Sequence, residues 1–130
     1  MQLPCEVGIK TVIPAIRALL AITLVERHGM NEKQTALILG LSQSAINRYK
    51  RKNRGNILKI DTDPEVQILI DKMLKLLISE KPQELFKILN IFCETCSVVR
   101  KKGTLCSMCQ KRKVESKVET CTFCFSKKSC

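Results

Sequence analysis

The amino-acid sequence predicts a mainly α protein, in which a helix-turn-helix bundle of four to five helices is followed by a small cysteine-rich, metal-stabilised module with little regular structure. Apolar residues recur at helical spacing through most of the first 92 residues, and a glycine separates two short amphipathic stretches near residue 40. Seven of the eight cysteines follow residue 92. The 130 residues therefore divide into zones at 1–60, 61–92 and 93–130.

The first expected helix begins near Pro14, because proline fixes a helical φ and its missing N–H is not needed in a first turn. It is expected to run to about Arg27 and to end at His28-Gly29. Apolar side chains cover more than one face of this segment: Val12, Ile13, Ala15, Ile16, Leu19, Leu20, Ile22 and Leu24. Such a helix is predicted to be central and buried on most sides.

The stretch Asn31–Arg54 fits a helix-turn-helix. Asn31 and Gln34 have the spacing of a capping box at the start of its first helix. Gly40 allows a turn with positive φ, and Ser42 can cap the second helix. Small and apolar residues occupy the inward positions of the unit: Ala36, Leu39, Leu41, Ile46 and Tyr49.

The second helix of this unit presents polar and basic side chains, which suit base edges and phosphates. Six basic residues and no acid occur between residues 48 and 59, and the net charge of +11 favours a polyanionic partner. A basic helix end is also favoured by the helix dipole alone. We expect contact with double-stranded DNA through Ser42, Gln43, Ser44, Asn47, Arg48, Lys50, Arg51, Lys52 and Arg54.

Residues 61–92 are expected to form a helical hairpin. Asp61, Thr62 and Asp63 offer N-caps, and Pro64 suits a first helical position. The apolar positions of the first helix are Val66, Leu69, Ile70, Met73, Leu74 and Leu77, and those of a second helix after Pro82 are Leu85, Phe86, Ile88, Leu89 and Phe92. The hairpin either completes the core or forms a homodimer surface, which would set two recognition helices one DNA turn apart.

The last zone contains three Cys-x2-Cys pairs and a final cysteine, with too few apolar residues for a core. Two such pairs enclose a tetrahedral site of four thiolates, the arrangement typical of structural zinc. Val98, Val99 and Leu105 suit short strands, with a turn at Gly103. The expected ligands are Cys93, Cys96, Cys106, Cys109, Cys121, Cys124 and Cys130, and Cys5 could supply an eighth thiolate.

Zinc is the preferred metal, and an iron–sulfur cluster such as [4Fe-4S] is the alternative, because both use sets of cysteines. The ending Cys121-x2-Cys124-x5-Cys130 resembles the spacing in cluster-bearing bacterial regulators of the WhiB type. A cluster would make the protein a sensor of oxygen, iron or redox state. Zinc would leave a structural module or an adaptor that docks on the transcription machinery.

Other functions and locations are less compatible with the sequence. The apolar run from Val12 to Val25 contains Arg17 and is too short to span a bilayer, and the N-terminus lacks a signal-peptide pattern. We therefore expect a cytoplasmic protein without a membrane partner, in which disulfides are rare. The sequence contains no nucleotide-binding loop, carboxylate pair or Cys-His couple, so it is not expected to be an enzyme.

The first sixty residues resemble archaeal helix-turn-helix transcriptional regulators of the lambda-repressor-like (XRE) superfamily. The segments that carry this resemblance are Pro4–Glu6, Val12–Ala18, Gly40–Tyr49 and Arg54-Gly55. The resemblance implies a compact bundle of four or five helices that binds operator DNA, usually as a dimer. It also implies that bases are read by Ser42, Gln43, Ser44 and Asn47, and that Cys5 has a packing role.

Overall fold

The structure is a computed structural model of the chain, and it describes residues 4–51, 60–79 and 84–102. In these ranges every regular element is a helix, which confirms the mainly α class. The helices are α1 (Pro4–Glu26), α2 (Glu32–Leu39), α3 (Gln43–Lys50), α4 (Pro64–Ile78) and α5 (Leu85–Lys101). Residues 103–130, which contain the last five cysteines of the predicted cysteine-rich module, lie outside the described residues.

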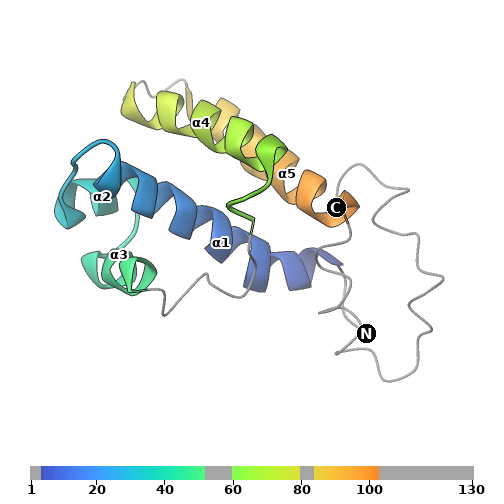
Figure 1. Ribbon diagram of the computed structural model, residues 1–130, viewed down its shortest axis with the longest axis horizontal. Helices are drawn as coiled ribbons and strands as arrows, with labels where there is room; N and C mark the ends of the chain where they lie inside the picture. Colours follow the sequence, from blue (N-terminus) through green and yellow to red (C-terminus); the bar gives the residue numbers. More distant parts are fainter. Residues whose placement is uncertain (1–3, 52–59, 80–83, 103–130) are drawn as a thin grey trace.

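The long helix α1 is the centre of the fold (Figure 1). Helices α2 and α3 lie at its C-terminal end, and the antiparallel pair α4–α5 packs along its other side. The main core joins this pair to α1 through fully buried side chains, among them Val12, Ile16, Leu20, Leu24, Val66, Ile70, Met73 and Val99. A second, smaller cluster joins α1 to α2 and α3. The helix predicted to be central is therefore central.

Helix α1 is longer than its sequence predicts, and the expected start at Pro14 is wrong. It begins at Pro4, so Pro14 lies inside the helix. Proline removes one helical hydrogen bond at that point, but Val12 and Ile16 on either side of it are completely buried. Tertiary packing thus overrides the local preference. The expected end is confirmed, because Gly29 has a φ of 63° and the Met30 N–H donates to the Leu24 carbonyl at 3.2 Å.

The apolar length of α1 also bears on the question of a membrane. The segment Gly8–Glu26 is long and apolar enough to cross a bilayer by length and composition, although half of it is buried inside the bundle. A core helix of a soluble bundle has the same properties, so this segment is weak evidence in either direction.

The start of α4 is as predicted, with Asp63 as N-cap and Pro64 in the first turn. Helix α5, however, continues through Cys93 and Cys96 to Lys101. The expectation of strands at Val98 and Val99 is therefore wrong. Val99 is 1% exposed in the core shared with α1 and α4. Packing against these helices therefore extends α5 past residue 92, where the second zone was expected to end.

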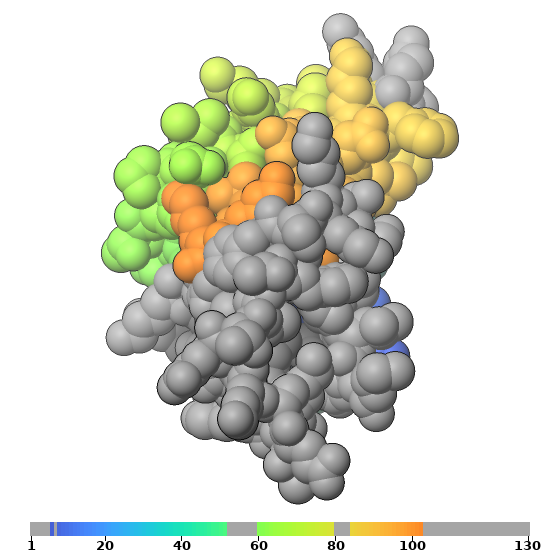
Figure 2. All heavy atoms as spheres, turned by 90° about the vertical axis from the view of Figure 1, so that its right-hand side faces the viewer, coloured from blue at the N-terminus to red at the C-terminus, as the bar shows by residue number. Residues whose placement is uncertain are grey.

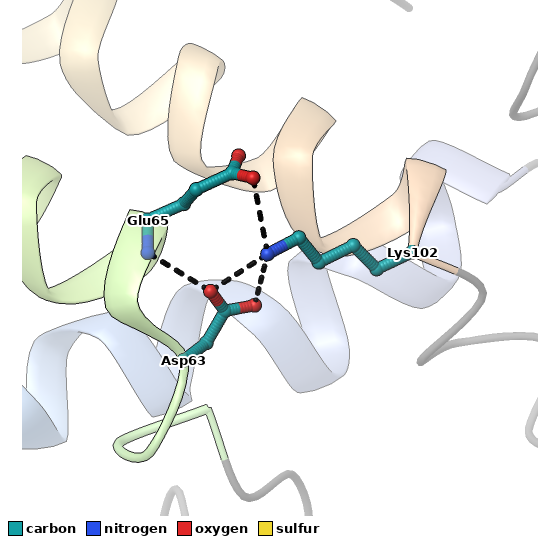
Figure 3. Close-up of polar contacts among 3 residues, drawn as sticks. All are labelled: Asp63, Glu65 and Lys102. Carbon is teal, nitrogen blue, oxygen red and sulfur yellow. Dashed lines mark hydrogen bonds and ion pairs between the residues drawn. The ribbon is translucent and has the colours of Figure 1, made fainter.

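An ion-pair cluster joins the beginning of α4 to the end of α5 (Figure 3). Lys102 Nζ donates to Asp63 Oδ1 at 2.7 Å and Oδ2 at 2.8 Å, and lies 3.4 Å from Glu65 Oε1. The hydrogen bond from Lys102 lowers the pKa of Asp63, and the same bond raises the pKa of Lys102. Asp63 also accepts the Glu65 N–H at 3.0 Å, so one carboxylate caps α4 and fastens α5.

Candidate nucleic-acid interface

Helix α2 begins with the capping box that its sequence predicts. Asn31 Oδ1 accepts the Gln34 N–H at 2.8 Å, and Gln34 Oε1 accepts the Asn31 N–H at 3.2 Å. Thr35 is completely buried, and its hydroxyl donates to the Asn31 carbonyl at 3.0 Å. These bonds satisfy backbone groups that a helix start leaves without partners, and so fix where α2 begins.

The turn between α2 and α3 is a Schellman motif centred on Gly40. Gly40 has a φ of 64°, in the left-handed region. The Leu41 N–H donates to the Ala36 carbonyl at 2.9 Å, and the Gly40 N–H donates to the Leu37 carbonyl at 3.4 Å. Ser42 Oγ then accepts the Ala45 N–H at 3.1 Å and caps α3. The expected pair of short capped helices with a glycine turn between them is therefore present, and the Ser42 hydroxyl acts in the cap.

The inner sides of α2 and α3 pack on α1 through small residues. Ala36, Ala45 and Ile46 are buried in one cluster with Ala18 and Ala21 of α1. Alanine at these positions lets the helix backbones approach closely. Tyr49, the only tyrosine of the chain, is 2% exposed in the same cluster. The inward positions expected from the sequence are thus buried, and Leu39 and Leu41 are partly buried beside them.

The outer side of α3 carries most of the predicted DNA-contact residues at the surface. Gln43, Ser44 and Arg48 are exposed, as are Lys50 and Arg51. Neither Arg48 nor Arg51 forms an ion pair with a carboxylate in the described ranges. Ser42 is exposed as well, and Asn47 is half-buried. Lys52 and Arg54 lie outside the described residues.

Glu32 is a further residue of this site that no sequence pattern indicates. Its Oε1 accepts a hydrogen bond from Lys50 Nζ at 3.1 Å and one from Asn47 Nδ2 at 3.4 Å. The bond from Lys50, followed by that from Asn47, lowers the pKa of Glu32. Glu32 thus ties two predicted DNA contacts to the start of α2. The contacts span 15 and 18 residues, so no local spacing rule indicates them.

The structure places only two of the predicted metal ligands, one turn apart on α5. Cys93 is exposed and Cys96 is half-buried. Burial raises the pKa of the Cys96 thiol, and the nearby Arg100 guanidinium opposes this rise without cancelling it. On the facing helix, a Cβ added to Gly8 would lie 3.3 Å from Cys96 Sγ, so α1 and α5 approach closely there.

The two thiols are not a complete metal site by themselves. No group of three or more potential ligands occurs among the described residues. A tetrahedral thiolate site would need two further cysteines. Cys106, Cys109, Cys121, Cys124 and Cys130 lie outside the described residues, as does the side chain of Cys5. Of the seven predicted ligands, the structure thus describes only Cys93 and Cys96.

The chain was compared with known protein families, curated proteins and solved structures. No protein family, curated protein or solved structure matches the chain. The resemblance to the lambda-repressor-like superfamily therefore remains a proposal based on the residues that carry it.

Proposed function

We propose that this protein is a sequence-specific DNA-binding transcriptional regulator of the archaeal lambda-repressor-like type, which acts in the cytoplasm and catalyses no reaction. The observation that carries this proposal is the capped α2–Gly40–α3 unit, whose second helix buries Ile46 and Tyr49 and exposes Gln43, Ser44 and Arg48. A short helix with a buried inner side and an outer side of amide, hydroxyl and guanidinium groups suits the major groove of DNA.

The roles of the side chains follow from their chemistry and position. Gln43, at the start of α3, can bond adenine through both its amide oxygen and its amide nitrogen. Arg48 and Arg51 can reach guanine or the backbone, and Lys52 and Arg54 are proposed to contact phosphates. Asn47 and Lys50 are held by Glu32, which limits how far they can reorient towards a base or phosphate.

A homodimer is part of this proposal. Leu85, Phe86 and Leu89 at the start of α5 are 58%, 78% and 51% exposed and form one apolar stripe, and contiguous exposed apolar surface marks interaction sites. Figure 2 shows the start of α5, in yellow, at the surface of the molecule. Burial of this stripe against a second copy would pair two α3 helices on one operator.

The C-terminal cysteines are proposed to bind zinc, with an iron–sulfur cluster as the alternative and Cys93–Cys96 as the first pair of ligands. Zinc would supply folding energy, whereas a cluster would supply a redox-sensitive group. The test is an ultraviolet–visible spectrum with metal analysis of protein purified without oxygen. Broad visible absorbance indicates a cluster, and a colourless sample with stoichiometric zinc indicates a zinc module.

The test of DNA recognition is selection from a pool of randomised duplexes at moderate ionic strength. We expect the full chain to enrich one operator motif. We expect the variant Lys10→Gln to enrich the same motif, because α3 packs on Ala18 and Ala21 and Lys10 lies about two turns earlier in α1. Salt-sensitive binding with no enriched motif would contradict sequence-specific recognition. Recovery of a transcription-machinery subunit in that case would favour the adaptor function.

A further inference from the structure

An open groove of about 500 Å³ lies between α4 and α5. Leu76 of α4 and Ile91 of α5 supply its apolar lining, and Lys72, Lys75, Lys87 and Glu94 are its charged residues. Figure 2 shows α4, in green, and α5, in yellow and orange, adjoining each other at the surface. We infer that this groove binds an acidic amphipathic helix of a partner protein.

The charge of the rim is the first argument for an acidic partner. Three lysines face the groove against one glutamate. Lys72 and Lys75 form no ion pair within the described part of the chain, and Lys87 lies 3.1 Å from Glu84 with two thirds of its side chain exposed. The rim is therefore positively charged, and carboxylates on a partner would complement it.

The apolar lining is the second argument, and it favours a helix over nucleic acid. Leu76 and Ile91 offer a surface on which leucine-like side chains gain free energy by burial, whereas a sugar–phosphate backbone does not. Glu94 would also repel phosphates. A groove with an apolar floor and a charged rim is the arrangement that binds the apolar face of an amphipathic helix. In Figure 1, α3 lies below α1 and α4 lies above it, so bound DNA and a bound helix would not compete for one surface.

Two other occupants have the wrong charge. A second copy seated groove to groove would bring the same lysines against one another, and like charges across an interface are unfavourable. Residues 103–130 of this chain carry six Lys and Arg against two Glu, so they are also positively charged. The exposed stripe Leu85–Phe86–Leu89 is not part of the groove lining, which separates this surface from the proposed dimer contact.

The experiment uses the full chain and a fluorescent synthetic peptide of about sixteen residues, with leucines on one face of its helix and glutamates on the other. Binding is measured by fluorescence anisotropy and located by amide chemical shifts. We expect shifts at Leu76, Asn90 and Ile91 and none on α3. The double variant Lys72→Gln/Lys75→Gln is expected to weaken binding by about tenfold or more. The control Lys10→Gln/Lys33→Gln removes two exposed lysines elsewhere, and it should change the affinity by less than about twofold.

Several results would overturn the inference. One is equal binding of a peptide with glutamine in place of glutamate, and another is unchanged affinity in Lys72→Gln/Lys75→Gln. Loss of duplex DNA affinity in this double variant, with DNA shifting the signals of Leu76 and Ile91, would assign the groove to nucleic acid. Conversion of a dimer to a monomer by the double variant, measured by light scattering, would assign it to a second copy. The peptide-binding readouts do not depend on operator recognition, so the inference and the proposed function fail separately.

Discussion

At the scale of single residues, Gln43 and Lys52 are predicted to contribute differently to DNA binding. Gln43→Ala should relax the base preference and weaken binding to the selected duplex by about 1–3 kcal/mol, because an amide that reads an adenine edge is lost. Lys52→Ala should weaken binding to all duplexes alike. It should also reduce by about one the number of counterions released on binding, which the dependence of affinity on salt concentration measures. Titrations of selected and shuffled duplexes at several salt concentrations distinguish the two. Equal weakening by both variants on both duplexes would contradict these roles.

Glu32 is predicted to restrain the recognition surface. Glu32→Gln should release Lys50 and remove a negative charge beside it, so affinity for unrelated duplexes should rise by about twofold to tenfold while discrimination between duplexes falls. Glu26→Gln is the matched control, because it removes an exposed carboxylate that forms no ion pair among the described residues. If both variants raise nonspecific affinity equally, net charge alone accounts for the effect and Glu32 has no specific role.

At the scale of elements, the turn between α2 and α3 depends on Gly40. Nothing lies within 4 Å of a Cβ added there, so Gly40→Ala should act through backbone strain alone. Because an L-residue in the left-handed region is strained, the free energy of unfolding should fall by about 1–2 kcal/mol. Urea denaturation measures this loss.

The matched control for this turn is Gly29→Ala. Gly29 has nearly the same φ, 63°, and equally open surroundings, but it ends α1 instead of joining α2 to α3. Both variants should be destabilised to a similar degree. Under conditions in which both are folded, only Gly40→Ala should lose operator affinity. Equal loss of affinity in both would mean that the turn has no special role in DNA binding.

The sequence predicts some helix ends to the residue and others wrongly. The capping box at Asn31, the left-handed Gly40 and the Ser42 cap are correct to the residue, because each depends on a few adjacent residues. The expected helix start at Pro14 is wrong because core packing on both sides of the proline decides it. The strands expected at Val98 and Val99 are likewise replaced by helix, since Val99 packs into the shared core.

Long-range contacts are the part of the site that sequence patterns do not predict. The bond between Glu32 and Lys50 and the lysine-rimmed groove both join residues of different helices. Their existence depends on how the helices are placed and not on spacing within either one. Metal binding by the seven cysteines stays a prediction, because only the pair Cys93 and Cys96 lies in the described part of the chain.

At the scale of the whole molecule, the Asp63–Lys102 contact is predicted to make stability depend on acidity. The pKa of Asp63 is lowered in the folded protein. Its stabilising contribution is therefore complete above the pKa of the unfolded chain, near 3.8, and is lost as the pH falls through the folded value. Asp63→Asn keeps an N-cap but should lose part of this acid dependence. The measurement is the free energy of unfolding in urea from neutral pH to about pH 3.

Two further variants separate capping from charge at this contact. Asp63→Ala removes the cap as well, and should lower the free energy of unfolding by about 0.5–2 kcal/mol even at neutral pH. Asp71→Asn is the control, because Asp71 is an exposed carboxylate of α4 that forms no ion pair among the described residues. Its free energy of unfolding should depend on pH as that of the unchanged protein does. An identical acid response in Asp63→Asn and Asp71→Asn would contradict the role of the Lys102 contact.

The narrow spacing at Gly8 also has an evolutionary consequence. A methyl group there would lie 3.3 Å from the Cys96 sulfur, so this side chain or the two helices would have to shift by a few tenths of an ångström. Substitutions at these two sites should therefore occur together during divergence: an alanine at position 8 is expected alongside a smaller residue at position 96. Descendants that retain this thiol should retain the glycine as well.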